Sequence, residues 1–282
     1  MINPSYQIRT MSHQEVQLAV DWAAAEGWNP GLHDAALFYA ADPQGFLAGF
    51  LGDRLIATIS AVRYRQDFGF IGFYIVTPEF RGHGYGWQLW QTAMQGLAGR
   101  NVGLDGVVAQ QDNYKKSGFL LAYNNVRYQA QVPARTANSA NIADLSALPF
   151  DTVLAYDSRC FFAPRPEFLR PWLTQPAGRA LGYVTDGNLQ GYGVIRQCRS
   201  GCKIGPLFAD NLEIADQLLT ALAGYAKGQS LFLDVPEPNP AAVALAGRHR
   251  MQPVFQTARM YTGPAPALDL TKVFGVTSFE LG

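Results

Sequence analysis

The stretch Ile75–Trp90 has residue types and spacing suited to binding an anion. It reads IVTPEFRGHGYGWQLW, with glycines at 82, 84 and 86 between an apolar run and an amphipathic run. Glycine weakens both strands and helices, so this cluster indicates a need for positive φ angles or for a bare backbone. The backbone N–H groups at the start of a helix lack partners and carry the positive end of the helix dipole. The stretch therefore predicts a phosphate-binding turn at a helix start.

Three classes of phosphate-binding loop compete for this stretch, and a glycine-rich turn without a ligand is the alternative to all of them. The Walker pattern requires a Lys-Ser/Thr pair after the last glycine, whereas Trp87 and Gln88 follow Gly86. The dinucleotide fingerprint requires glycine at position 87 and a loop after the first strand, whereas this loop follows the third expected strand. The remaining pattern is Arg-x-x-Gly-x-Gly, formed by Arg81, Gly84 and Gly86.

The elements that must position this loop follow from hydrophobic periodicity. Apolar residues at helical spacing predict helices over Gln14–Glu26, Asp34–Tyr39 and Trp87–Leu97, and a helical turn from Lys115. Apolar, β-rich runs predict strands over Gly45–Leu51, Leu55–Tyr64, Phe68–Val76, Asn101–Val108 and Phe119–Gln129. Because helices and strands do not alternate strictly, we expect an α+β (mixed α/β) fold with helices on both faces of a mixed sheet.

The order of these motifs repeats in the second part of the chain, which indicates a domain duplication. GDRLIATISAVRYR resembles DGNLQGYGVIRQCR, and the offset between matched positions is 133 residues from Gly72 to Gly205. The stretch 131–145 is rich in Ala, Asn, Ser and Thr and has no apolar periodicity. We therefore predict two domains, at 1–130 and 146–282, joined by a linker at 131–145.

The first half resembles the GNAT superfamily of acyl-CoA N-acyltransferases, through its Arg-x-x-Gly-x-Gly pattern and its element order over Tyr6–Gln129. The resemblance implies two GNAT-like domains, each a mixed twisted sheet flanked by helices, and acetyl-CoA as the acyl donor. It implies that the strand over Phe73–Val76 offers backbone groups to the pantetheine arm, while the glycine loop holds the pyrophosphate. The cofactor-binding residues implied in this way are Tyr74, Ile75, Val76, Arg81, Gly82, His83, Gly84, Tyr85 and Gly86.

A second motif, YKKSGF over Tyr114–Phe119, resembles the Tyr-x-x-x-Gly-Phe segment of the same superfamily. The resemblance implies that the Tyr114 hydroxyl faces the acyl-CoA sulfur and protonates the departing thiolate, or shares a proton with it. A tyrosine that only packs a helix start is the structural alternative. The family often has Asn seven residues earlier, where this chain has Val107, and Gln110 or Gln111 could replace that contact.

The general base is less clearly marked in the sequence. Many relatives place a glutamate on the strand before the loop, whereas GFYIV offers only Tyr74. The candidates are Asp105, His33, Asp34 and His83, and each also suits a structural role, as a strand-end, helix-start or loop residue.

The second half resembles a GNAT domain that has lost its cofactor loop. Asp210 and Asn211 have the types of a helix cap where the glycine loop would be, and Ala246 stands where the tyrosine would be. We expect this degenerate domain to shape the acceptor site or the domain interface. Two sets of residues are candidates for contact with the acceptor: the arginines Arg159, Arg165 and Arg170, and the aromatic residues Trp22, Trp28, Phe38, Tyr39 and Phe46.

Composition limits the class of protein. The 282 residues carry a formal net charge of +0, which argues against nucleic acid or an anionic membrane as the main partner. No apolar run reaches the ~20 residues of a membrane helix, and the N-terminus has no signal pattern, so we expect a cytoplasmic protein. Cys160, Cys198 and Cys202 form no metal or disulfide pattern and are expected to be free thiols, with no metal site.

The resemblance implies an N-acetyltransferase that moves an acetyl group from acetyl-CoA to an amine, by direct attack of the amine on the thioester. The expected partner is a small-molecule amine or amino acid, and a homodimer is kept as an option. The rival class is a non-catalytic acyl-CoA sensor, favoured by the missing strand glutamate.

Overall fold

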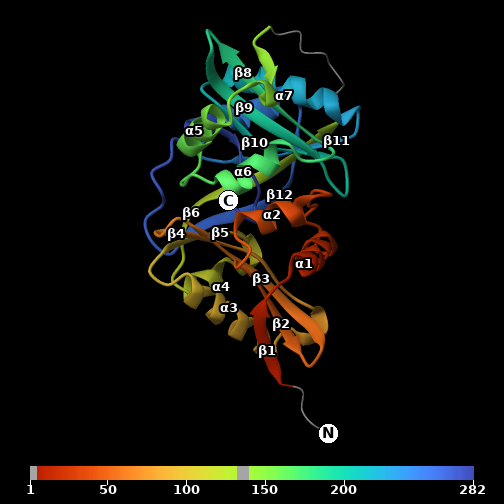
Figure 1. Cartoon of the computed structure of the whole chain (residues 1–282), viewed down its shortest axis with the longest axis vertical. Coiled ribbons are helices and arrows are strands. Elements are labelled where there is room, and N and C mark those ends of the chain that lie inside the picture. Colours follow the sequence, from red (N-terminus) through yellow and green to blue (C-terminus); the bar gives the residue numbers. More distant parts are fainter. Residues whose placement is uncertain (1–4, 132–139) are drawn as a thin grey trace.

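The computed structural model describes residues 5–131 and 140–282. Within them the chain forms eight α-helices and one mixed sheet of 13 strands (Figure 1). The strands are β1 Tyr6–Thr10, β2 Phe46–Leu51, β3 Arg54–Tyr64, β4 Phe68–Val76, β5 Asn101–Val107, β6 Leu120–Gln131, β7 Ile142–Asp144, β8 Gly178–Thr185, β9 Asn188–Gln197, β10 Cys202–Ala209, β11 Ser230–Pro236, β12 Gln252–Tyr261 and β13 Val273–Gly275. The helices are α1 His13–Ala25, α2 Asp34–Ala41, α3 Tyr85–Gly96, α4 Gln111–Lys116, α5 Phe150–Cys160, α6 Pro166–Leu173, α7 Leu212–Ala223 and α8 Pro240–Arg248.

The helices and strands predicted for the first half are present, and β1 is an additional strand that was not predicted. Strands β1 to β4 form an antiparallel meander, and α3 crosses over so that β5 returns parallel to β4. Helix α1 begins at a capping box, in which the Ser12 side chain accepts from the Glu15 backbone and the Glu15 side chain accepts from the Ser12 backbone. The predicted helices Gln14–Glu26 and Trp87–Leu97 agree with α1 and α3 to within two residues. The predicted α+β fold is confirmed.

Two strands are exchanged between the halves. The sheet runs β1-β2-β3-β4-β5-β12-β6-β11-β10-β9-β8-β7, so β12 of the second half pairs with β5, and β6 of the first half lies between β12 and β11. The strand expected over Phe119–Gln129 therefore exists as β6 but does not close the sheet of its own half. The two halves share one continuous sheet, as the adjacent ribbons of β5, β12 and β6 show in Figure 1.

Strands β4 and β5 separate part-way along their length. They pair in parallel only from Phe68–Ile71 to Asn101–Leu104. Immediately afterwards Phe73 has a positive φ of 49°, and its carbonyl accepts a hydrogen bond from Thr58 Oγ1 at 2.9 Å. This bulge turns the end of β4 away from β5 and opens a cleft between the two strands.

The second half has the same separation, but its cleft is filled. Strands β10 and β11 pair in parallel only at Cys202–Ile204. Beyond that point β13 pairs antiparallel with β10, and a Cβ at Gly275 would lie 2.6 Å from a methyl group of Leu233 on β11. The gap between β10 and β11 is therefore occupied by the protein's own strand.

Residues 276–282, here called the crossing segment, are buried throughout and run between the two halves. A Cβ at Gly72 on β4 would overlap the carbonyl oxygen of Glu280, and a Cβ at Gly205 on β10 would overlap that of Thr277. These glycines are the pair related by the sequence repeat. Both are needed because the backbone of the crossing segment comes so close to them.

Helices of both halves meet in a shared core. Phe38 on α2 stacks on Trp172 of α6 with ring centroids 5.9 Å apart, and Phe38 and Phe46 are both 0% exposed. The prediction that Phe38 and Phe46 line an acceptor pocket is therefore wrong, because both rings fill this core. Trp22 and Tyr39 pack against the same core.

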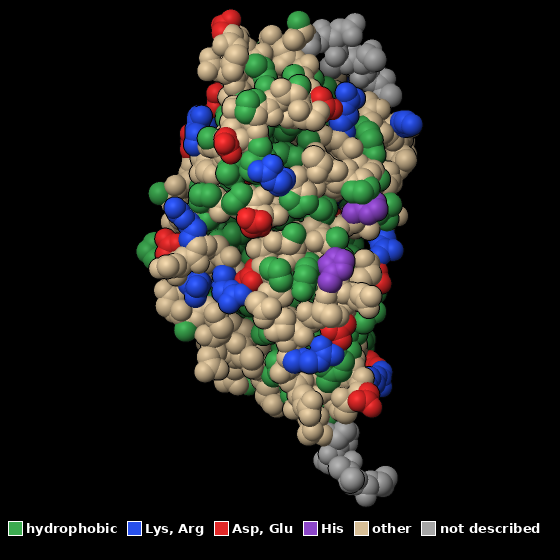
Figure 2. All heavy atoms as spheres, in the orientation of Figure 1, with side chains coloured by type: hydrophobic (Ala, Val, Ile, Leu, Met, Phe, Trp, Pro, Cys, Tyr) green, Lys and Arg blue, Asp and Glu red, His purple; other side chains and the backbone are tan. Residues whose placement is uncertain are grey.

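Three further sequence expectations concern the linker, the surface and the cysteines. Of the predicted linker, residues 132–139 lie outside the described residues, and Ile142–Asp144 is strand β7, paired with β8. On the face shown in Figure 2, acidic and basic side chains are interspersed, in keeping with the net charge of +0. Within 5–131 and 140–282, no helix has the length and apolar character needed to span a membrane. Cys160, Cys198 and Cys202 are buried free thiols.

Candidate active site

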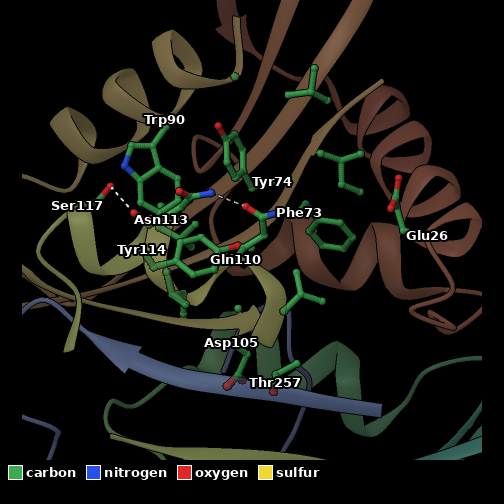
Figure 3. Close-up of a pocket in the computed structure, with 18 of the residues that line it drawn as sticks. Glu26, Phe73, Tyr74, Trp90, Asp105, Gln110, Asn113, Tyr114, Ser117 and Thr257 are labelled. Atoms are coloured by element: carbon green, nitrogen blue, oxygen red, sulfur yellow. Dashed lines mark hydrogen bonds between the residues drawn. The ribbon is translucent and has the colours of Figure 1, made fainter. Parts of the chain in front are cut away.

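A cavity of about 820 Å³ occupies the cleft between β4 and β5. Most of the residues predicted from the sequence line it: Tyr74, Ile75, Val76, Arg81, Gly82, Gly84, Gly86 and Tyr114. His83 and Tyr85 are not among the lining residues. Figure 3 shows that the side chains of Tyr74 on β4 and Tyr114 on α4 converge on this space.

The glycine loop forms the start of α3. Gly82 and Gly84 have φ angles of 80° and 84°, which L side chains rarely adopt. Gly84 is the N-cap residue, no side chain caps the helix, and its first turn contains no acidic residue. At Gly86 a Cβ would lie 2.8 Å from the Tyr74 hydroxyl. The helix therefore starts with unblocked backbone donors, which suits a pyrophosphate.

Arg81 fixes the loop to its neighbours. Its Nε donates to the Val76 carbonyl at 2.8 Å, and its Nη2 donates to Glu26 Oε1 at 2.5 Å, joining the loop to β4 and to the end of α1. The Arg81 side chain is 50% exposed, so its charge is screened by solvent. Its main effect is to hold the loop in place.

Tyr114 is fixed by packing on two sides. Its ring stacks on Trp90 of α3 with centroids 5.8 Å apart, and a Cβ at Gly106 would overlap the ring. Burial, with a further contribution from nearby Tyr74, raises the pKa of Tyr114 to about 12. The hydroxyl is therefore neutral and able to donate a hydrogen bond throughout the physiological range.

The segment between β5 and Tyr114 contains the two glutamines that were considered as replacements for the missing asparagine. Gln110 lines the cavity and Gln111 does not. Gln110 Oε1 accepts a hydrogen bond from Asn113 Nδ2 at 2.7 Å. Of the two glutamines considered, only Gln110 is positioned to meet a ligand in the cavity (Figure 3).

None of the four predicted bases presents a free group to the cavity. Asp105 lines it, but both carboxylate oxygens accept from Arg259, at 2.8 and 2.6 Å. Asp34 lies elsewhere, 1% exposed and paired with Arg196 at 2.9 Å. His33 is the N-cap residue of α2, and neither it nor His83 lines the cavity. The two carboxylates already form ion pairs with buried arginines, and the two histidines do not line the cavity. The predictions of a general base at these four residues are therefore not supported.

The second half contributes residues that sequence reasoning missed. Phe255 and Thr257 on β12, and Phe279 and Glu280 in the crossing segment, line the same cavity. Thr257 Oγ1 and Glu280 Oε2 are buried without a hydrogen-bond partner in the described part of the chain. No local motif marks these residues, since they reach the cavity only through the strand exchange and the crossing segment.

The arginines proposed for the acceptor have other partners. Arg165 is buried and bound to Asp157 at 2.9 and 2.7 Å. The Arg170 guanidinium lies over the Phe150 ring at 3.8 Å, and Arg159 lies 3.8 Å from Asp210. None of the three lines the cavity, so the prediction that they recognise the acceptor there is wrong.

The corresponding helix start in the second half is closed by its own side chain. Asn211 caps α7 by accepting from the Ile214 backbone at 3.0 Å, as its type predicted. Among the described residues, no group of three or more His, Cys, Asp or Glu side chains is arranged to hold a metal ion.

Comparison with known proteins agrees with this geometry. The model of the Acetyltransferase (GNAT) family matches residues 7–119, and that of the Acetyltransferase (GNAT) domain matches residues 153–275. The chain is 31% identical over 272 residues to the holothin acyltransferase of Pseudoalteromonas sp., covering 96% of this chain and 92% of that protein. The chain belongs to the GNAT superfamily. It is an acyl-CoA N-acyltransferase with two GNAT domains in tandem.

Solved structures share the fold of this GNAT protein. One, from Pyrococcus horikoshii and provisionally assigned as an acetyltransferase, has a TM-score of 0.83 at 20% identity and covers 98% of this chain and 96% of its own. A tandem GNAT protein from the clavulanic acid biosynthesis pathway has a TM-score of 0.64 at 15% identity, covering 93% of this chain and 100% of its own. At these identities the likeness concerns the fold alone.

Proposed function

We propose that this GNAT protein transfers an acetyl group from acetyl-CoA to the amine of a small molecule. The observation that carries the proposal is the open N-terminus of α3 at Gly84, in the same cavity as the buried Tyr114 hydroxyl. A helix start that can bind phosphates and a neutral hydrogen-bond donor that can stabilise a departing thiolate together suit a CoA thioester.

The cofactor would lie along the cleft in two parts. The amides around Gly82, Gly84 and Gly86 would hold the pyrophosphate, and the backbone of Tyr74–Val76 would meet the pantetheine arm, because the bulge at Phe73 frees that edge from β5. Bound acetyl-CoA supplies an activated acyl thioester. The loop and strand orient it and exclude water from the cleft.

Tyr114 would donate a hydrogen bond to the departing sulfur. A thiol has a pKa of about 8.5, well below the value of about 12 for Tyr114, so complete transfer of the phenolic proton to a thiolate is uphill. A shared proton that stabilises negative charge on sulfur is the more favourable arrangement. Tyr114 would therefore act as a donor that strengthens as the C–S bond breaks.

The acceptor would enter from the side formed by the second half. The cavity wall there contains the aromatic rings of Trp28, Phe73, Phe255 and Phe279. Such a wall favours a compact amine with an apolar or flat body. The likeness to the holothin acyltransferase makes holothin one of the first acceptors to test.

A two-part assay tests this function. First, acetyl-CoA binding is measured by calorimetry on Gly84→Ala and on the control Gly187→Ala, a glycine with a similar φ of 77° that does not line the cavity. Only Gly84→Ala should weaken binding, by ~10-fold or more, since charge-assisted hydrogen bonds to the phosphates would be lost. Equal affinity of the two variants would contradict the loop assignment.

Second, holothin and a panel of small amines are incubated with acetyl-CoA, and released thiol and acetylated product are measured. Turnover with at least one amine supports the enzyme. Tight acetyl-CoA binding with no amine-dependent thiol release across the panel would favour the rival proposal of an acyl-CoA sensor.

A further inference from the structure

Glu280 reaches the cavity from the far end of the chain. The crossing segment that carries it is anchored to both halves: the Tyr64 hydroxyl donates to the Leu281 carbonyl at 2.9 Å, and Arg165 Nη2 donates to Thr277 Oγ1 at 2.8 Å. The Glu280 backbone is pressed against Gly72, next to the bulge of β4. A carboxylate is thereby supplied beside the strand whose own sequence, GFYIV, offers none.

Three carboxylates line the cavity, and they differ in whether an arginine is bound to them. Glu26 is bound to Arg81, and Asp105 is bound to Arg259. Glu280 forms no ion pair within the part of the chain that the structure describes, although it is only 3% exposed and its Oε2 atom lacks any hydrogen-bond partner there. An unpaired buried carboxylate is costly, so a cationic partner in the cavity would stabilise its charged form.

The charges around Glu280 do not supply that partner. Arg127 on β6 is bound to Asp234 at 2.6 Å, and Arg196 on β9 is bound to Asp34 at 2.9 Å. Each pair neutralises its own charges, although Arg196 Nη1 is buried and lacks a hydrogen-bond partner among the described residues. Neither arginine forms an ion pair with Glu280 in the described part of the chain.

Lys203 on β10 is the remaining nearby cation, 1% exposed and without an ion pair among the described residues. Burial raises the pKa of the Glu280 carboxyl and Asp34 adds to the rise, while Lys203, Arg127 and Arg196 oppose it. This direction moves the carboxyl toward the range in which a general base works best near neutral pH.

The surroundings of Glu280 suit the ammonium group of a molecule with an apolar body. Thr257 lines the same wall, and its Oγ1 is a second buried oxygen without a hydrogen-bond partner among the described residues. Phe255 and Phe279 lie on the same wall, with ring centroids 6.3 Å apart. The Arg127 guanidinium already lies over both rings, 5.8 Å from the Phe255 centroid and 4.9 Å from the Phe279 centroid. The rings therefore suit the apolar body of the ligand, and the Glu280 carboxylate suits its ammonium group.

We propose that Glu280 binds the ammonium group of the acyl acceptor and takes its proton, which makes Glu280 the general base of the reaction. This inference rests on the proposed function. The nitrogen gives one proton to the Glu280 carboxylate, and its freed lone pair attacks the thioester carbonyl carbon and forms the N–C bond. The C–S bond then breaks, and its bonding electrons leave with sulfur. The nitrogen then loses a second proton, which is transferred to the departing sulfur and gives the thiol beside Tyr114, and Glu280 returns its own proton to solvent.

Binding of a simple probe tests Glu280 without any turnover. Benzylamine carries an ammonium group on an aromatic body, and benzyl alcohol has the same shape without the charge. Both are titrated by NMR into the wild-type protein, Glu280→Gln, Glu280→Asp and the control Glu237→Gln, whose side chain is exposed and outside the cavity. Glu280→Gln should bind benzylamine at least ~10-fold more weakly and benzyl alcohol unchanged, with Glu237→Gln equal to wild type.

The pH profile supplies the catalytic readout. With any acceptor found in the amine panel, kcat/KM should fall ~10²-fold or more in Glu280→Gln, and the acidic limb of the wild-type profile should disappear. Glu280→Asp should recover part of the rate, because the charge remains. A purely structural carboxylate would lower the melting temperature and leave the profile shape unchanged.

Acetyl-CoA affinity, measured on the same samples, separates this proposal from the proposed function. Unchanged acetyl-CoA affinity with lost benzylamine affinity supports Glu280 as the ammonium site. Equal benzylamine affinity in folded Glu280→Gln overturns that role, whatever the acetyl-CoA affinity. Weak acetyl-CoA binding by the wild-type protein would instead count against the cofactor assignment.

Discussion

At the scale of single residues, the cavity brings together two groups with shifted proton affinities that are far apart in the sequence. Tyr114 belongs to the first half and keeps its proton, since burial raises its pKa to about 12. Glu280 belongs to the crossing segment and has a carboxylate with no partner in the described chain. When two titratable groups lie in different environments, their pKa values differ, and one site can contain both a proton donor and a proton acceptor.

Replacing Tyr114 by Phe isolates the role of its hydroxyl. The ring and its stacking on Trp90 remain, so folding should be preserved. Because the hydroxyl acts as charge develops on sulfur, kcat should fall by up to ~10²-fold with little change in acetyl-CoA affinity. Single-turnover kinetics together with calorimetry measure the two effects. A large loss of affinity at unchanged kcat would make Tyr114 a cofactor contact instead.

Glu280 should also affect the pH dependence of stability. Its pKa is raised in the folded protein, so folding favours the protonated form; the stabilisation is complete below the unfolded value of about 4.3 and is lost as the pH rises through the folded pKa. Glu280→Gln stays neutral, so its stability relative to wild type should increase with pH over that window. Urea unfolding at several pH values checks this, with Glu237→Gln as control. A constant difference between Glu280→Gln and wild type would contradict it.

At the scale of elements, the same strand separation has opposite outcomes in the two halves. Between β4 and β5 it leaves a cavity, and between β10 and β11 it is filled by β13. The helix that follows also differs: α3 starts at Gly84 with no side-chain cap, whereas α7 is capped by Asn211. Among the described residues, this strand separation therefore leaves an open cleft in the first half and a filled one in the second.

The filled cleft predicts one acetyl-CoA per chain. Calorimetric titration of the wild-type protein should give a stoichiometry near one, because β13 occupies the space between β10 and β11 and Glu213 in the first turn of α7 repels phosphate. Gly84→Ala should weaken that single transition. Two equivalent transitions would show that the second half also binds the cofactor.

At the scale of the whole molecule, the exchanged strands make the halves interdependent. β6 pairs only with β11 and β12 of the second half, and β12 pairs only with β5 and β6 of the first half, among the described strands. The crossing segment adds a further tie through Gly72 and Gly205. The acceptor side of the cavity consequently exists only when both halves are present.

Separate expression of residues 1–139 and 140–282 tests this interdependence. Each fragment alone would expose unpaired strand edges and should be poorly folded or aggregate. Co-expressed fragments should associate, co-purify and bind acetyl-CoA, since every exchanged strand then finds its partners. Circular dichroism and pull-down of a tagged fragment are the measurements. A soluble, cooperatively folding first fragment would argue against the dependence.

The sequence by itself determined the local features of this protein. The helices α1 and α3 and the positive-φ glycines at 82 and 84 were predictable, because each depends on residues close together in the chain. Tyr114 could be placed near the glycine loop only through the resemblance to the GNAT superfamily.

Only the tertiary structure decided which distant segments meet. Because the two halves have matching strands, β6 and β12 each have similar possible partners in both halves. The local sequence pattern therefore does not predict whether each strand pairs within its own half or is exchanged with the other half. The pairing of Asp105 with Arg259, and the position of Glu280 beside Gly72, follow from that choice. Periodicity and propensity report the local chain, whereas strand pairing and burial of charge depend on contacts between residues far apart in the sequence.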